Sequence, residues 1–195
     1  MTILLLSGSP STPSRSSRLL HYAGDKLKAL GYHTVSLNVK DLPAQALLHA
    51  DFVHPELIEA KQKLAEAKAI VIATPIYKAA YSGLLKTFLD ILPQDGLHGK
   101  LVLPLATGGS QSHLLALDYA LRPVLAALSA DHVLPSVYAT DAQVDWSEQH
   151  GLQIDPSIIK RLHEGVHYLA ARLISLHEPE LPTAPVIRMQ NRCSA

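Results

Sequence analysis

The sequence predicts an α/β protein in which a parallel sheet is covered by helices on both faces. Short apolar runs alternate with helix-length segments, which is the order that successive βαβ units produce. Several runs, such as Ala-Ile-Val-Ile-Ala at residues 69–73, would be apolar on both faces of a strand. Such strands are typical of a sheet with helices on each side. The 195 residues suit a single domain with a sizeable core, and no internal repeat is evident.

Five apolar runs have the length of strands. They are residues 3–6, 35–39, 69–73, 101–106 and 133–139. The helix-length segments between and after them are residues 17–30, 55–67, 83–92, 113–128 and about 156–176. Five strands and five helices in this order fit the doubly wound flavodoxin-like topology, with the sheet order 2-1-3-4-5. The pattern also permits another small α/β winding.

The predicted domain spans residues 1–177. Residues 178–195 contain three prolines and no apolar period, so we expect a tail that is mobile or wraps a partner. The single cysteine, Cys193, allows no disulfide within the chain, which suits a reducing compartment. Neither a signal peptide nor an apolar run of about 20 residues is evident. We therefore expect a cytoplasmic protein with no membrane partner.

The charge balance disfavours several classes of partner. Lys plus Arg and Asp plus Glu each total 17, so the formal net charge is zero. A general nucleic-acid binder normally carries a basic excess, and we expect no nucleic-acid partner. Electron carriers with this fold are typically strongly acidic so that they dock on basic proteins. A non-enzymatic carrier is therefore the less favoured alternative.

The loop after the first predicted strand has the composition of a phosphate site. In a sheet of this kind, ligands bind beyond the carboxyl ends of the strands, where the strand order reverses. Residues 7–17 read Ser-Gly-Ser-Pro-Ser-Thr-Pro-Ser-Arg-Ser-Ser and lead directly into a helix. The free amides of a helix N-terminus, serine hydroxyls and an arginine all favour a phosphate. The loop matches neither Walker A nor Gly-x-Gly-x-x-Gly. We predict a site for the phosphate of FMN, with a cluster of capping serines as the alternative.

The loops after the third and fourth strands would face the same crevice. Pro75 keeps Thr74 out of helical geometry, and Tyr77 would present an aromatic ring where an isoalloxazine could lie. Residues 107–110, Thr-Gly-Gly-Ser, contain adjacent glycines, which let backbone amides approach a planar ligand. Taken singly, these loops could hold a half-buried tyrosine and a plain turn. Together with the first loop, they predict a flavin site.

Four stretches of the sequence resemble the NADPH-dependent FMN reductases, and most closely the reductase component of two-component alkanesulfonate monooxygenase systems. The resemblance covers about residues 1–140. Its motifs are Gly-Ser-Pro-x-x-Pro-Ser-Arg-Ser-Ser at 8–17, Ala-Thr-Pro-Ile-Tyr-Lys-Ala-Ala-Tyr-Ser-Gly-x-Leu-Lys-Thr at 73–87, Leu-Pro-Leu-Ala-Thr-Gly-Gly at 103–109 and His-Leu-Leu-Ala-x-Asp-Tyr-Ala-Leu-x-Pro-Val-Leu at 113–125.

The resemblance implies an enzyme that uses FMN and NADPH, with the nicotinamide and flavin rings stacked for hydride transfer. It implies cofactor-binding roles for Ser9, Arg15, Ser16, Ser17, Pro75, Ile76, Tyr77, Thr107, Gly108 and Gly109. The hydride step requires no general acid or base, so no catalytic residue is predicted. Reduced FMN would pass to a separate flavin-dependent monooxygenase that cleaves organosulfonates for sulfur supply. No basic cluster in the sequence identifies a clamp for the extra phosphate of NADPH, so the preference over NADH rests on the resemblance.

Residues 113–128 carry an independent prediction about assembly. Nearly every position from 114 to 128 is apolar or alanine, except Asp118 and Arg122. A helix that is apolar all round is usually buried on all sides, and a chain of this size has little interior to bury it. We therefore predict a homo-oligomer, specifically a tetramer, formed through this helix. The alternative is a bent core helix in a monomer.

The same segment contains a proline at an interior helical position. Pro123 would deny a hydrogen bond to the carbonyl of Tyr119 and crowd it. A kink or a π-bulge is therefore expected near Tyr119, and such bulges often mark functional sites. The resemblance implies that this tyrosine lies near the flavin across the subunit interface.

Residues 163–167, His-Glu-Gly-Val-His, match the zinc-protease pattern H-E-x-x-H. A glycine within the motif weakens a helix, and no third ligand is convincingly placed. The segment is also far in sequence from the three ligand loops. We therefore interpret it as a solvated helical face and predict no metal.

Two further functions remain open. Another flavodoxin-like oxidoreductase could reduce quinones, azo dyes or metal oxyanions while keeping FMN bound, because the same crevice would serve both reactions. A structural or regulatory flavodoxin-like domain would be favoured only if no flavin binds.

Overall fold

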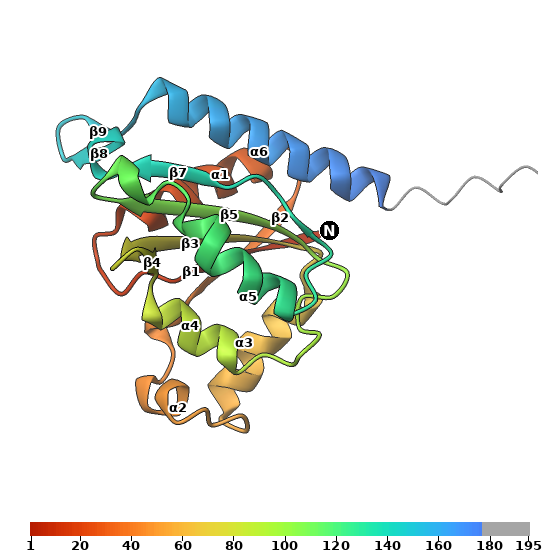
Figure 1. The fold of residues 1–195 in the computed structure, drawn as a ribbon. Helices are drawn as coiled ribbons and strands as arrows, with labels where there is room; N and C mark the ends of the chain where they lie inside the picture. Colours follow the sequence, from red (N-terminus) through yellow and green to blue (C-terminus); the bar gives the residue numbers. More distant parts are fainter. Residues whose placement is uncertain (177–195) are drawn as a thin grey trace, which may run out of the picture.

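The computed structural model describes residues 1–176 and has the predicted layered α/β architecture (Figure 1). Its strands are β1 (Thr2–Ser7), β2 (His33–Asn38), β3 (Ala69–Tyr77), β4 (Ala80–Tyr81), β5 (Leu101–Gly108), β6 (His132–Val133), β7 (Val137–Thr140), β8 (Val144–Ser147) and β9 (Gly151–Ile154). Its α-helices are α1 (Arg15–Ala29), α2 (Ala44–Leu48), α3 (Pro55–Glu66), α4 (Gly83–Asp90), α5 (Arg122–Ala127) and α6 (Pro156–Ser175). The shorter helical elements are η1 (Val39–Asp41), η2 (Gln111–His113), η3 (Leu117–Leu121) and η4 (Asp141–Gln143). The predicted tail, with Cys193, lies outside the described residues.

The main sheet has the predicted flavodoxin-like order. Strands β2, β1, β3, β5 and β6 lie side by side in that order and pair in parallel. The predicted order 2-1-3-4-5 is therefore confirmed. The strand order reverses between β1 and β3, which places the carboxyl ends of β1, β3 and β5 next to one another. A short antiparallel strand, β4, extends the end of β3 and was not predicted.

Helices cover both faces of the sheet, as the two-sided apolar strands predict (Figure 1). Alternate residues of β1 enter different cores: Leu4 and Leu6 pack with α3, α4 and α5, whereas Ile3 and Leu5 pack with α1 and α6. Gly165 lets α6 lie close to β5, because a Cβ at this position would be 3.2 Å from Leu103 Cδ1. The glycine of the H-E-x-x-H match thus has a packing role.

The fifth predicted strand is split in two. β6 ends at Val133 and β7 begins at Val137, with Pro135 between them. Proline has no N–H to donate to a neighbouring strand, so the ladder is interrupted there. Both halves pair with β5, and the interruption leaves the sheet order unchanged.

Two arginines donate hydrogen bonds to backbone carbonyl groups along this edge of the sheet. Arg122 donates to the carbonyls of Val133 and Leu134, at 2.9 Å and 3.4 Å. From the other face, Arg161 of α6 donates to the carbonyls of residues 136 and 138, at 3.0 Å and 3.2 Å. An edge strand with free carbonyls can pair with another chain. Because the two guanidinium groups already donate to these carbonyls, this edge is less able to pair.

The expected distortion before Pro123 is present as the π-helix η3, which contains Tyr119 and leads directly into α5. The prediction of a π-bulge near Tyr119 is therefore confirmed. Within the single chain the segment is buried on one side only: Leu117 and Leu121 are in the core, whereas Leu115 and Tyr119 are 51% and 78% exposed. An apolar face of this segment is thus open on the surface.

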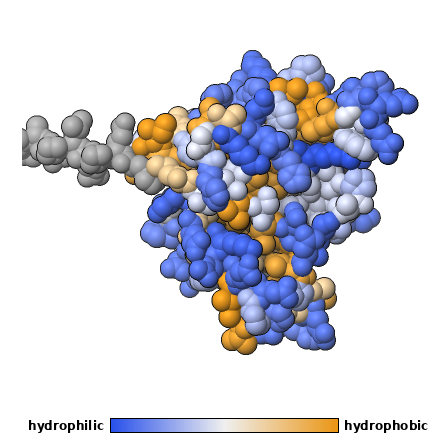
Figure 2. Space-filling view, turned by 180° about the vertical axis from the view of Figure 1, so that it is seen from behind, coloured by the Kyte–Doolittle hydropathy of each residue, from blue (hydrophilic) through white to orange (hydrophobic). Residues whose placement is uncertain are grey.

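The face of the molecule seen in Figure 2 is mostly hydrophilic, with apolar patches. One patch lies at the lower end of the molecule, where Figure 1 places α2, and Leu48, Phe52 and Val53 are exposed in and after this helix. No helix within residues 1–176 is long and apolar enough to cross a membrane.

Candidate functional site

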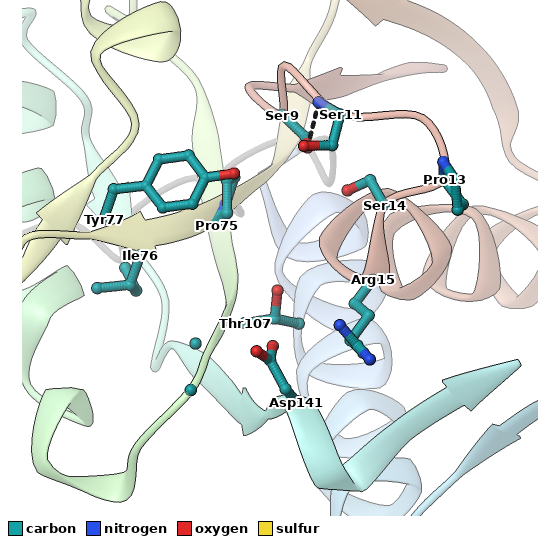
Figure 3. Close-up of a pocket in the computed structure, with 12 residues that line it drawn as sticks. Ser9, Ser11, Pro13, Ser14, Arg15, Pro75, Ile76, Tyr77, Thr107 and Asp141 are labelled. Atoms are coloured by element: carbon teal, nitrogen blue, oxygen red, sulfur yellow. Dashed lines mark hydrogen bonds between the residues drawn. The ribbon is translucent and has the colours of Figure 1, made fainter.

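The three predicted loops meet in one crevice at the carboxyl edge of the sheet (Figure 3). The crevice lies between the loop after β1, the end of β3, the end of β5 and the start of η4. Its lining residues are Ser9, Ser11, Pro13, Ser14, Arg15, Pro75, Ile76, Tyr77, Thr107, Gly108, Gly109 and Asp141. Every site residue predicted from the sequence is among them, except Ser16 and Ser17.

One end of the crevice carries hydrogen-bond donors and the start of a helix. Helix α1 begins at Arg15, and the Oγ of Ser14 caps it by accepting a hydrogen bond from the amide of Ser17 at 3.2 Å. The Arg15 Nε donates to the carbonyl of Val144 at 3.0 Å. This bond fixes the guanidinium beside the crevice, and its terminal nitrogens bond to no other described residue. Such a donor set is suited to a phosphate group.

The hydroxyls of Ser16 and Ser17 support the loop instead of lining the crevice. Ser16 is fully buried, and its Oγ lies 3.1 Å from the Oγ of Ser14. The Oγ of Ser17 lies 2.8 Å from the Oγ of Ser7. Consecutive residues in the first turn of a helix point in different directions, so a run of serines cannot all face one ligand. Ser11 and Ser14 line the crevice and were not predicted, although they lie in the same hydroxyl-rich loop.

The other end of the crevice is formed by the β3–β4 hairpin, which carries Tyr77. The Tyr77 side chain is 48% exposed and extends over the crevice in Figure 3. The turn residues Lys78 and Ala79 have positive φ values of 50° and 64°, the sign that a two-residue type I′ hairpin turn requires. Neither residue is a glycine or asparagine, so the turn holds backbone strain beside the site.

Buried hydrogen bonds join the loops after β1 and β3. The amide of Ser82 donates to the Oγ1 of Thr74 at 3.0 Å, and the hydroxyl of Ser82 donates to the carbonyl of Gly8. The amide of Gly8 in turn donates to the carbonyl of Ala73 at 2.8 Å. These bonds fix the separation of the two ends of the crevice.

The adjacent glycines after β5 have different surroundings. A Cβ on Gly108 would lie 2.7 Å from the hydroxyl oxygen of Tyr138 and 3.3 Å from the Cβ of Ile76. A Cβ on Gly109 would meet only an Asp141 oxygen, at 3.9 Å. Gly108 is therefore required by protein packing, whereas a side chain at Gly109 would meet little of the protein; both glycines line the crevice.

The hydroxyl of Tyr138 supports the same loop by donating to the carbonyl of Ser110. Burial raises the pKa of Tyr138, and the nearby Asp141 carboxylate raises it further. The phenol therefore stays protonated and remains a donor. The loop between β5 and η2 is held in place by this contact.

Asp141 is a site residue that the sequence did not indicate. It follows β7, at the start of η4, and its carboxylate points into the crevice near Thr107 (Figure 3). β7 lies beside β5 in parallel, so the residue after β7 reaches the same edge as the loop after β5. Only the placement of the split fifth strand could have identified it.

Two other predicted features lie outside the crevice. Tyr119 is not among its lining residues, and η3 packs instead against β4, in the hairpin that carries Tyr77. In α6, the Nε2 of His163 is hydrogen-bonded to the hydroxyl of Tyr22 at 2.9 Å. Within residues 1–176 no group of three His, Cys, Asp or Glu side chains could hold a metal ion.

The residues of the crevice fit the chemistry of the parts of FMN. Hydroxyls, a helix N-terminus and an arginine stand at one end. An aromatic side chain and the glycines after β5 stand at the other. A parallel sheet of this order with such a site defines a flavodoxin-like flavoprotein.

Comparison with known proteins identifies the family. The family model for NADPH-dependent FMN reductases matches residues 1–145, and the chain belongs to this family. It is therefore an oxidoreductase, and FMN and NADPH are the cofactors of the family.

Similar proteins extend over most of the chain. It is 49% identical over 163 residues to an FMN reductase (NADPH) of Escherichia coli, covering 83% of this chain and 84% of that protein. It is 42% identical over 183 residues to an FMN reductase (NADPH) of Pseudomonas putida, covering 93% of each. A solved structure of an NADH:FMN oxidoreductase in its apo form superposes with a TM-score of 0.79 and 38% identity, covering 93% of this chain and 91% of that one.

Proposed function

We propose that this chain binds FMN in the crevice, reduces it with NADPH and then releases it. The observation that carries the proposal is the convergence of the three loops on one site with distinct ends. The phosphate of FMN would lie at Ser9, Ser14 and Arg15. The isoalloxazine ring would lie between Tyr77 and the backbone at Gly109, with Pro75, Ile76 and Thr107 against its edge.

The protein's part in the reaction is binding and orientation. When bound, FMN would supply the redox chemistry as the acceptor of a hydride. The half-exposed Tyr77 and the fixed loop after β5 would hold the flavin ring in place for contact with the nicotinamide ring. The Asp141 carboxylate is an acceptor beside Gly109, and it suits the N–H of the pyrimidine part of the flavin. Amides of the same loop are suited to the carbonyls of that ring.

The first experiment measures turnover and flavin binding. The purified chain is mixed with FMN and with NADPH or NADH, and oxidation of the nicotinamide is followed by absorbance. Arg15→Gln should weaken FMN binding by about 10- to 100-fold, as expected for loss of a charged hydrogen bond. Riboflavin, which lacks the phosphate, should bind the wild-type protein and Arg15→Gln equally. Arg172→Gln, which alters an exposed arginine on Tyr168, is the control. The assignment is wrong if FMN is not reduced, or if Arg15→Gln weakens riboflavin as much as FMN.

The release of reduced FMN is tested by retention of flavin. The resemblance of the sequence to reductases of alkanesulfonate systems supports delivery to a flavin-dependent monooxygenase in organosulfonate assimilation. A desalting column should strip FMN from the protein. Reduced FMN should also reach a monooxygenase held behind a dialysis membrane. If flavin instead stays bound through turnover and azo dyes or quinones are reduced, the alternative of a reductase with resident FMN is correct.

A homo-oligomer, specifically a tetramer, is proposed through the segment from η2 to α5. The apolar side chains of Leu115 and Tyr119 are exposed there, and a contiguous exposed apolar face is typical of a subunit contact. Leu115→Glu should convert the oligomer to smaller species in analytical ultracentrifugation. Leu48→Glu, at the exposed patch beside α2, provides a matched control. A monomeric wild-type chain would contradict the proposal.

A further inference from the structure

A second cavity lies on the other side of the loop that follows β1. This cavity, here called the basic pocket, has a volume of about 250 Å³. Its lining residues are Ser11, Thr12, Pro13, Ser14, Ser17, Arg18, His21, Asn38 and Lys40. It shares Ser11, Pro13 and Ser14 with the crevice, so the two cavities are separated only by this loop.

The pocket cannot be identified from the sequence alone, because the basic residues that line it come from different segments of the chain. Arg18 and His21 lie one turn apart on α1, whereas Lys40 follows β2 in η1. Strands β1 and β2 are parallel neighbours, so the helix after one and the turn after the other reach the same edge of the sheet. The tertiary structure thus assembles a basic cluster that no single stretch of sequence shows.

Among the described residues, the two permanent cations are held in place without a carboxylate partner. The Arg18 guanidinium lies 4.7 Å from the centre of the Trp146 ring, a cation–π contact, and the Lys40 ammonium donates to the hydroxyl of Thr12. None of the ion pairs formed within residues 1–176 includes Arg18 or Lys40. The nearby Asp41 carboxylate accepts a hydrogen bond from Asn38 at 3.0 Å. Two oriented cations at one cavity attract an anion.

We infer that the basic pocket binds the 2′-phosphate of NADPH and selects this nucleotide over NADH. The inference rests on the proposed function, which brings the nicotinamide to the crevice next door. NADPH and NADH differ only in this phosphate, so discrimination between them requires donors that contact it. Guanidinium and ammonium groups are the strongest phosphate donors among side chains. The 5′-phosphate of FMN has the same chemistry, but the crevice already supplies Arg15 and the start of α1 for it.

Substitution of the two cations tests the selectivity. Arg18→Gln and Lys40→Gln, singly and together, should lower kcat/KM for NADPH, by about 10- to 100-fold in the double variant. The value for NADH should change by less than about 2-fold, because its adenosine ribose carries no 2′-phosphate to contact these groups. Lys28→Gln is the control for each single variant, since Lys28 lies at the far end of α1 and pairs with Asp25 at 3.2 Å. Thermal unfolding establishes that every variant is folded.

Binding measurements separate the pocket from the flavin reaction. Calorimetric titration of the wild-type chain with adenosine 2′,5′-bisphosphate should give tighter binding than titration with adenosine 5′-monophosphate. The double variant should lose this difference. These titrations need no flavin, so they decide the role of the pocket even if the chain fails to reduce FMN.

Three results would overturn the inference. Equal losses with NADPH and NADH would mean that the cations act on a part common to both nucleotides. Weaker binding of FMN with unchanged binding of riboflavin would assign the pocket to the flavin phosphate. Unchanged kinetics and unchanged bisphosphate binding would show that the cations contact neither phosphate.

Discussion

Substitution of Gly108 by alanine tests whether the loop after β5 is fixed by packing. The added methyl group would lie 2.7 Å from the Tyr138 hydroxyl oxygen and 3.3 Å from the Ile76 Cβ. Neither neighbour can move aside easily. Tyr138 is 2% exposed and its hydroxyl is bonded to Ser110, while the Cβ of Ile76 is attached directly to the backbone of β3.

The expected cost is that of an overpacked core position. Insertion of a methyl group into a well-packed site costs about 1–3 kcal/mol. For a chain of this size each kcal/mol lowers the melting temperature by about 2–4 °C, so Gly108→Ala should lower it by about 2–12 °C. Gly109→Ala is the matched control, because its methyl group would meet only an Asp141 oxygen at 3.9 Å. It should leave the melting temperature unchanged and instead weaken FMN binding, since the methyl group enters the crevice.

Calorimetry of the two variants, with and without FMN, separates the effects. Tyr138→Phe removes the closest atom and should recover part of the loss when combined with Gly108→Ala, in a double-mutant cycle. If the melting temperature of Gly108→Ala equals that of the wild-type protein, the steric argument is refuted. If Gly109→Ala melts as low as Gly108→Ala, the loop is intolerant of any side chain and the distinction between the glycines is wrong.

Further substitutions probe other parts of the fold. Lys100 donates to the carbonyls of Ala65 and Ala67 at 2.8 Å and 2.7 Å, so Lys100→Met should cost about 1–3 kcal/mol in urea unfolding. Burial, aided by Lys68, lowers the pKa of Lys100, so its contribution to stability falls as the pH falls through the folded-state pKa. The difference in the free energy of unfolding between wild type and Lys100→Met should therefore increase as the pH rises toward the unfolded-state pKa of about 10.4. A difference that does not change with pH would contradict this. Arg122→Met should lower stability by about 1–3 kcal/mol and favour aggregation in light scattering, because it frees two carbonyls at the sheet edge. Ala79→Gly should raise stability by up to about 1 kcal/mol by relieving its positive φ, and a lower urea midpoint would count against strain in the turn.

The layered fold was predictable because its signals are local. Apolar runs of strand length and helix-length segments alternate along the chain, and their order restricts a doubly wound sheet to few topologies. The predicted bounds of individual helices and strands differed from the observed ones by a few residues. The short helix α2 and the β8–β9 hairpin were not predicted, since neither has a long periodic pattern. The π-helix at Tyr119 was also predictable, because the proline that produces it acts on the carbonyl four residues earlier.

Part of the candidate site was beyond local signals. The serine-rich loop predicts a group of hydroxyls, but the cap at Ser14 and the start of α1 decide which of them reach the crevice. Ser16 is therefore buried. Asp141 enters the site because β7 pairs with β5, a contact between segments about thirty residues apart in sequence.

The sequence by itself determined the alternation of strands and helices, the loops at the strand ends and the distortion before Pro123, since each follows from residues close together in the chain. Only the tertiary structure decided that Gly108 packs against Tyr138, and that Arg18 and Lys40 share a pocket. The physical reason is that these contacts join elements through the parallel sheet, and the separation of two side chains across a sheet depends on register and helix packing, which no single stretch of sequence contains.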